Sequence, residues 1–205
     1  MRLTIVYNNE AREKLKSGWG FSCLIEIDSQ KLLFDTGDKP EDLLFNMNIL
    51  GINPKDVSTV VISHNHWDHA GGLDGFMEKN GNKAKVIHPE AFSEPAKITE
   101  SIYSTGLLKS QGTPDEQSLF IKTKKGLVVV VGCSHPGVDK ILDVVKKHGK
   151  VHALIGGFHG FDKFDKLAGI DIIGACHCTK HMQEIKSRFP KQFKEIKAGD
   201  SIEIE

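Results

Sequence analysis

The chain places four potential metal ligands directly after a short apolar run, and this arrangement constrains its fold more than any other feature. Val60-Val61-Ile62 reads as a buried strand, and it leads into His64-Asn65-His66-Trp67-Asp68-His69. Ligands in open α/β sheets gather beyond the carboxyl ends of strands. His64 and His66 are two residues apart, so in an extended segment both face the same way and can bind one ion. Asp68 and His69 lie past the turn and could face a second ion.

Three further apolar runs end in histidine, often with glycine beside it. The segments that follow them are Gly132-Cys133-Ser134-His135, Gly156-Gly157-Phe158-His159 and Cys176-His177-Cys178-Thr179. Four strand ends that carry metal-binding side chains predict a site at the carboxyl ends of the strands. Imidazole and carboxylate ligands suit zinc, iron and manganese.

The hydrophobic patterns predict an α/β fold with two mixed sheets. An antiparallel meander comes first, crossover units follow, and a hairpin closes the chain. The predicted strands cover residues 3–7, 21–27, 32–34, 58–62, 85–87, 119–122, 127–131, 151–155 and 170–175, and the closing hairpin pairs 193–196 with 202–204. The predicted helices cover residues 40–50, 73–79, 138–147 and 181–188, and residues 90–117 are predicted to be rich in loops with at most one helix.

Size and charge narrow the class of protein. A chain of 205 residues without linkers or low-complexity segments predicts one domain. Basic and acidic residues number 27 each, so no long-range field favours nucleic acid or a membrane, and a small-molecule substrate is expected. No signal peptide or spanning segment is evident, and four cysteines are too few for a disulfide scaffold, so a cytoplasmic location is expected. The oligomeric state stays open.

The stretch His64-x-His66-x-Asp68-His69-Ala70-Gly71-Gly72 resembles the signature of the metallo-β-lactamase superfamily. Asp35-Thr36-Gly37, the hairpin before Cys133 and His177 fit the motif order of that superfamily. The resemblance implies one αββα four-layer sandwich over residues 1–205, in which two mixed β-sheets are flanked by helices. It also implies one or two divalent ions, with zinc expected and iron or manganese as alternatives.

The resemblance assigns the ligands as well. His64 and His66 would hold the first metal, Asp68 and His69 the second, and His177 matches the last ligand motif. Asp35 matches the buried carboxylate that orients the ligand loop. The segments around Cys133, His159 and His177 are similar to a branch of metal-dependent hydrolases, in which some members are synthases of a dihydropterin-linked ribofuranosyl-aminobenzene phosphate in methanopterin biosynthesis.

The chain departs from the superfamily pattern at two places. Most members carry a third histidine before the hairpin and a bridging aspartate after it, whereas here those places hold Asp115-Glu116-Gln117 and Cys133. Two alignments compete, because His135 is either the third histidine of the first metal or a residue that reaches in from the bridging position. In both alignments His135 is a metal ligand. Whether Cys133, Asp115 or Glu116 replaces a missing ligand stays open.

A hydrolytic mechanism follows from these assignments. A bound metal lowers the pKa of water towards roughly 7, and the resulting hydroxide attacks a small ester, lactone or phosphoester. Asp68 orients the hydroxide, and His159 donates a proton to the leaving group or binds a substrate oxyanion. Replacement of His159 should lower turnover while the metal content stays near that of the wild type.

Other functions and simpler roles compete with this hypothesis. Di-iron oxygen or nitric-oxide reductases use the same fold but carry a carboxylate where this chain has His66; a third hypothesis is a binding module that keeps the metal site as an effector pocket. Simple structural roles are expected for Cys176 and Cys178, as core packing or weak redox groups, and for Trp67, as packing that fixes the loop. The same is expected for the isolated histidines His88, His148, His152 and His181.

Overall fold

The computed structural model describes residues 1–205. The chain divides into two compact units: unit 1 comprises residues 1–89 and 196–204, and unit 2 comprises residues 90–195 with residue 205. Each unit contains one mixed six-stranded sheet and the helices that flank it. Two mixed sheets flanked by helices were predicted from the sequence, and this fold class is confirmed. That residues 1–205 act as a single domain stays a prediction.

The sheet of unit 1 has the strand order β12-β1-β2-β3-β4-β5. Its strands are β1 (Arg2–Tyr7), β2 (Ser22–Ile27), β3 (Gln30–Phe34), β4 (Thr59–Val61), β5 (Lys85–Ile87) and β12 (Ser201–Glu203). The pairs from β12 to β3 are antiparallel, and β3, β4 and β5 are mutually parallel. The carboxyl ends of three strands therefore meet at one edge, where the ligand-bearing loops begin.

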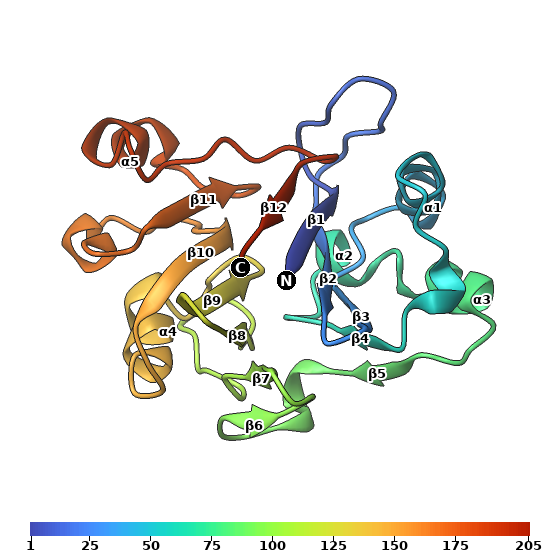
Figure 1. Cartoon of the computed structure of the whole chain (residues 1–205), viewed down its shortest axis with the longest axis horizontal. Coiled ribbons are helices and arrows are strands. Elements are labelled where there is room, and N and C mark those ends of the chain that lie inside the picture. Colours follow the sequence, from blue (N-terminus) through green and yellow to red (C-terminus); the bar gives the residue numbers. More distant parts are fainter. The chain divides into compact units, whose positions relative to one another are not determined.

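Two helices cover a face of this sheet, α1 (Pro40–Ile49) and α3 (Leu73–Asn80), and they lie side by side (Figure 1). Proline at the first helical position and two acidic residues in the first turn favour the start of α1. The buried side chains Leu43 and Met47 of α1 and Phe76 of α3 pack against strand residues such as Leu33 and Val60. A four-residue helix, α2 (Trp67–Ala70), and a 3₁₀ turn at Pro54–Asp56 complete the connections.

The sheet of unit 2 has the strand order β11-β10-β9-β8-β7-β6. Its strands are β6 (Ala96–Lys97), β7 (Ile102–Ser104), β8 (Leu119–Thr123), β9 (Gly126–Val131), β10 (Val151–Gly157) and β11 (Ile172–Cys176). The pairs from β6 to β9 are antiparallel, and β9, β10 and β11 are parallel. The helices are α4 (Val138–Val145) and α5 (Met182–Arg188), with 3₁₀ turns at Pro89–Ala91 and Phe164–Leu167.

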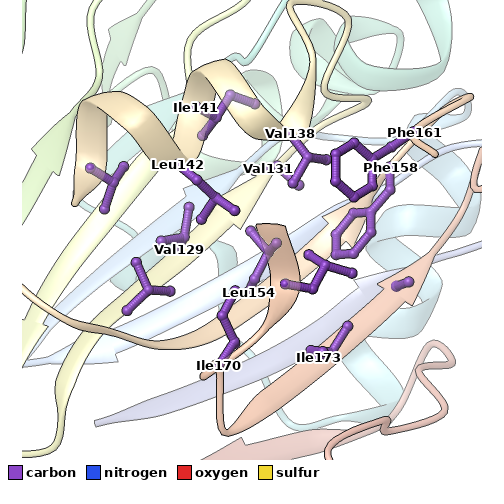
Figure 2. Packing of buried hydrophobic residues seen from close by; sticks show 14 of the residues in the cluster. Val129, Val131, Val138, Ile141, Leu142, Leu154, Phe158, Phe161, Ile170 and Ile173 are labelled. Atoms are coloured by element: carbon purple, nitrogen blue, oxygen red, sulfur yellow. The ribbon is translucent and has the colours of Figure 1, made fainter. Parts of the chain in front are cut away.

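The core of unit 2 forms where α4 packs on the parallel strands (Figure 2). Val138, Ile141, Leu142 and Val145 recur at helical spacing and make one apolar face. Figure 2 shows Leu142 of α4 beside Val129 of the sheet, and Phe158 and Phe161 beside Val138. Burial of each such aliphatic side chain stabilises the folded state by about 1.5–3 kcal/mol relative to leaving it exposed. This packing holds the parallel strands of unit 2 in place, and the candidate ligands of unit 2 follow the carboxyl ends of these strands.

The two sheets share one connectivity, although the sequence contains no visible repeat. In each sheet three antiparallel strands are followed by two parallel strands reached through crossovers, and an additional antiparallel strand pairs with the first strand. The parallel strands of unit 1 lead into Asp35 and His64, and those of unit 2 lead into Cys133, His159 and His177. In each sheet, the candidate site residues therefore follow the carboxyl ends of the parallel strands.

The structure corrects three of the sequence predictions. Residues 90–117 contain the short strands β6 and β7 rather than loops alone. The closing hairpin is wrong, because β12 pairs with β1 whereas Phe193 forms a bridge with Ile173 in the sheet of unit 2. Helical spacing within residues 40–50 also predicts that Phe45 and Ile49 share one face with the leucines, yet both are exposed.

None of the helices is long and apolar enough to cross a membrane.

Candidate metal centre

In unit 1, the loop after β4 places two imidazoles against each other. His64 is fully buried, and its Nε2 lies 3.2 Å from Nδ1 of His66. The two rings meet edge to face, with their centroids 4.8 Å apart. Two ring nitrogens that face one small volume can both donate a lone pair to a cation placed there. The donor set therefore fits a divalent metal ion.

A buried carboxylate, Asp35, orients the histidines of unit 1. It accepts hydrogen bonds from the backbone N–H and the hydroxyl of Ser63, both at 2.7 Å, and Nδ1 of His69 lies 2.7 Å from its Oδ2. The Ser63 hydroxyl lies 2.9 Å from Nδ1 of His64. Because the carboxylate only accepts, His69 donates from Nδ1; because the hydroxyl donates to Asp35, it accepts from Nδ1 of His64. Both histidines then present an unprotonated Nε2, as metal ligands require.

Asp68 and His69 are brought together by the single turn of α2. Asp68 is 5% exposed, and its Oδ2 lies 3.7 Å from Nε2 of His69. The backbone N–H and hydroxyl of Thr36 both donate to the carbonyl of His69, at 2.7 Å and 3.0 Å. Gly72 permits this close packing, since a Cβ at that position would lie 2.2 Å from the carbonyl oxygen of Thr36. The helix turn is thus held from its backbone as well as through Asp35.

Trp67 does not have the packing role that the sequence predicted. Its side chain is 61% exposed, although it stands between two ligand candidates in α2. The loop is fixed instead by the Asp35 hydrogen bonds and by the contacts to the backbone of the α2 turn.

In unit 2, the buried carboxylate of Glu116 organises the loop after β9. Its Oε1 accepts the backbone N–H groups of Gly132, Cys133 and Ser134 at 2.9–3.1 Å, and its Oε2 accepts that of His135 at 2.9 Å. Nδ1 of His135 lies 3.2 Å from the same Oε2. Successive N–H groups that converge on one anion form a nest. Glu116 is therefore the counterpart of Asp35 in this unit, and it holds the loop that presents His135.

Cys133 lies between two of the predicted ligands of unit 2. Its Sγ is within 4.8 Å of a ring nitrogen of His135 and within 4.8 Å of a ring nitrogen of His177. The thiol is 3% exposed, and the imidazole of His135 is also 3% exposed. Three potential ligands from two strand ends thus converge within this unit.

His159 and Cys178 form a pair beside these ligands. The hydrogen bond with Cys178 is the main cause that raises the pKa of His159 above its ordinary value. Hydrogen bonds from Cys133 and then from His159 lower the pKa of Cys178 to about 4, against the effect of burial. His159 also packs edge to face on His135, with ring centroids 5.2 Å apart, and both line a cavity of about 370 Å³ in unit 2.

The backbone is in the left-handed region at four residues of these strand ends. The φ angles are 58° at Asp35, 60° at Ser134, 43° at His159 and 51° at His177. Residues other than glycine seldom adopt this conformation, which costs roughly 1–3 kcal/mol at each position. Such strain persists only where surrounding contacts hold it, and here it coincides with the side chains of the candidate site.

A model of the metallo-β-lactamase superfamily matches residues 20–160, more than half of the chain. The chain belongs to this superfamily. Members of the metallo-β-lactamase superfamily typically bind divalent metal ions, and the histidine, aspartate and cysteine side chains above are candidate ligands.

Individual relatives agree with this membership. A curated protein of Methanocaldococcus jannaschii, named 7,8-dihydropterin-6-methyl-4-(β-D-ribofuranosyl)-aminobenzene-5′-phosphate synthase, is 29% identical over 266 aligned positions that cover 90% of each chain. A crystal structure described as a metal-dependent hydrolase of the β-lactamase superfamily matches with a TM-score of 0.80 and 24% identity over 100% of this chain and 99% of that one. The metallo-β-lactamase fold protein YhfI of Bacillus subtilis matches with a TM-score of 0.72 and 14% identity over 98% of both.

The metallo-β-lactamase signature residues lie as follows. Unit 1 brings together His64, His66, Asp68 and His69, and unit 2 brings His135 and His177 next to Cys133. Asp115 is at the surface, where it pairs with Lys109 at 2.6 Å, so it replaces neither missing ligand. Sequence reasoning left open what Glu116 does and missed Ser63 and the contact of Cys178 with His159.

The isolated histidines have contacts outside these clusters. His148 stacks on Phe120, with ring centroids 4.8 Å apart. His152 contacts Asp171 at 2.8 Å, and His181 contacts Glu184 at 2.9 Å.

Proposed function

We propose that the protein is a metal-dependent hydrolase of a small ester, lactone or phosphoester. The ligands in this proposal are His64, His66, Asp68, His69, His135 and His177, and zinc is the expected ion. The observation that carries the proposal is the hydrogen-bond chain from Asp35 through Ser63 and His69, which leaves two Nε2 lone pairs unprotonated. A second carboxylate, Glu116, holds His135 through its backbone N–H at 2.9 Å and lies 3.2 Å from its Nδ1.

The chain supplies a proton donor and orients the reactants. When bound, a divalent ion would lower the pKa of water and polarise the bond under attack. Asp68, which is nearly buried beside His69, is placed to accept a hydrogen bond from the attacking water and to orient it. The hydrogen bond with Cys178 raises the pKa of His159, which favours its protonated form, and the protonated imidazole can deliver a proton to the leaving group. Its Nδ1 makes no hydrogen bond within the protein, and the residue lines the cavity of unit 2 together with His135.

The first experiment separates proton transfer from metal binding. His159→Asn is the informative variant, because asparagine tolerates the φ of 43° better than alanine does. Turnover of an alkyl ester, a lactone or an alkyl phosphodiester, whose alkoxide leaving groups need a proton, should fall about 10²–10⁴-fold, as expected for loss of a general acid. The metal content measured by mass spectrometry should stay at the wild-type value. Loss of metal in this variant would make His159 a ligand instead.

A matched control is His152→Asn. His152 is also a histidine paired with a partner, Asp171, but it lies outside the candidate site. This variant should keep both activity and metal. Complete inactivity of the metal-loaded wild-type protein across the panel would refute the hydrolase and favour an effector-binding module.

A second candidate function is a reaction like that of the synthase from Methanocaldococcus jannaschii. Its similarity spans 90% of both chains, which favours a shared overall arrangement of the polypeptide. The test is to incubate the metal-loaded protein with a ribofuranosyl-aminobenzene phosphate and a dihydropterin whose 6-methylene carbon carries a diphosphate leaving group. The joined product and the released diphosphate are then measured by mass spectrometry. Product formed by the wild type but not by His64→Asn would favour this reaction over hydrolysis.

A further inference from the structure

The proposed reaction gives no role to Cys133, although its sulfur lies beside two of the histidines that bind the metal in that proposal. The Sγ atom is within 4.8 Å of a ligand nitrogen of His135 and of one of His177. Zinc binds thiolate sulfur at about 2.3 Å and imidazole nitrogen at about 2.0–2.1 Å, so two donors on one tetrahedral ion lie roughly 3.5 Å apart. A small movement of the side chains suffices for Cys133 to share an ion with either histidine.

The position of Cys133 is fixed from several directions. Its backbone N–H is one of four that bind the carboxylate of Glu116. The next residue, Ser134, has a φ of 60° and donates its hydroxyl to the carbonyl of Gly157 at 2.7 Å. A cysteine that only fills a core needs no such restraint. Cys23, for comparison, lies inside β2, where complete burial raises the pKa of its thiol and no histidine is hydrogen-bonded to it.

A second cysteine supports the first. Gly157 lies between them: a Cβ on this residue would be 2.7 Å from Sγ of Cys178 and 3.3 Å from Cα of Cys133. The absence of a side chain at Gly157 therefore allows Cys178 to reach across β10, where its Sγ lies 3.8 Å from the carbonyl oxygen of Cys133. Cys178 is thus placed to hydrogen-bond to a sulfur at position 133 while its other contact is with His159.

We propose that Cys133 is a metal ligand and donates its thiolate at the place where most members of the superfamily carry a bridging aspartate. The inference rests on the proposed function, because it requires the metal ion of that site. The thiol gives up its proton to solvent as the sulfur–metal bond forms, so each ion bound releases one proton from Cys133. Since thiolate is a soft ligand, the site should prefer zinc and cobalt to magnesium and manganese.

Cobalt(II) substitution tests the inference without any activity measurement. A cobalt–thiolate bond gives an intense near-ultraviolet charge-transfer band, whereas histidine and carboxylate ligands give only weak visible bands. The full-length wild type and Cys178→Ser should both show the near-ultraviolet band. Cys133→Ser should lose the band and bind cobalt at least about tenfold more weakly. Cys133→Asp should keep cobalt binding but lack the band, which shows that the site is still folded.

Each outcome discriminates between the inference and the proposed function. Stoichiometric cobalt without a thiolate band in the wild type overturns the inference and leaves the metal site of the proposed function intact. A band that survives in Cys133→Ser but is lost in Cys178→Ser assigns the sulfur to Cys178 and also overturns it. A wild-type protein that binds no cobalt refutes both the inference and the metal-dependent function.

Discussion

Replacement of Glu116 by glutamine should destabilise the protein far more than the loss of one charge suggests. The glutamine carbonyl can keep three of the backbone hydrogen bonds, but bonds to a neutral acceptor are weaker by roughly 1 kcal/mol each. The amide NH₂ would face the backbone N–H of His135, and that buried donor would lose its acceptor at a cost of about 1–3 kcal/mol. Relief of the buried charge offsets part of the loss. We expect unfolding of the metal-free variant to require about 2–4 kcal/mol less free energy, measured by urea denaturation with linear extrapolation.

The neighbouring residue provides a matched control. Asp115→Asn makes the same chemical change one position earlier, but Asp115 is at the surface and pairs with Lys109. Asp115 also accepts the backbone N–H of Ser110 at 3.0 Å, and because exposed contacts of this kind contribute little, the unfolding midpoint of Asp115→Asn should fall much less than that of Glu116→Gln. If Glu116→Gln also unfolds at the wild-type urea concentration with an unchanged slope, the carboxylate does not hold the loop by its charge, and the comparison with Asp35 fails.

Three further predictions follow from the local geometry. Asp35→Asn should weaken zinc binding about 10–100-fold in a competition titration, because asparagine has one acceptor oxygen where the carboxylate uses two. Either the Ser63 N–H, or the Ser63 hydroxyl together with Nδ1 of His69, then loses its acceptor; wild-type affinity would contradict the orienting role. Cys178→Ser should lower the pKa of His159 in an NMR titration of the metal-free protein. In the wild type, the stabilisation from His159 is lost as the pH rises through its raised pKa, and the stabilisation from Cys178 is lost as the pH falls through about 4. The melting temperatures of the two proteins should therefore differ most between these two pH limits. Gly72→Ala should lower the melting temperature because its Cβ would meet a backbone carbonyl at 2.2 Å, whereas Gly160→Ala, whose Cβ would meet only a flexible side chain at 4.0 Å, should leave it unchanged.

The sequence predicted the parts of the fold that depend on local pattern. Alternation of apolar residues and the turns at glycine located the long strands, and helical spacing located α4, whose buried face recurs as expected. Strands β6 and β7 have only two and three residues, too few for alternation to be visible. The pairing of β12 with β1 joins opposite ends of the chain, and no local pattern specifies such a partner. The closing hairpin was therefore an error of pairing rather than of strand location.

The candidate site likewise combines residues that a local pattern predicts with contacts that no local pattern predicts. The spacing of His64, His66, Asp68 and His69 is a local signal, and the structure brings these residues together. Glu116 binds a loop 16 to 19 residues farther along the chain, and the sequence gives no sign of that contact.

Strand alternation carried past Cys176 predicts that the side chain of Cys178 points away from His177. The strand ends at Cys176, and the φ of 51° at His177 breaks the alternation. The side chain of Cys178 therefore turns towards Cys133.

The left-handed backbone at Ser134, His159 and His177 changes how mutagenesis of this protein should be interpreted. Valine or isoleucine at these positions would misfold the turn whatever the chemistry of the side chain, since β-branched residues disfavour positive φ most strongly. A saturation library scored by activity alone would then rank residues by their conformational preference. Asparagine, aspartate and glycine are the substitutions that keep the turn while removing the imidazole or hydroxyl. A loss of turnover therefore reports on catalysis only for these three substitutions.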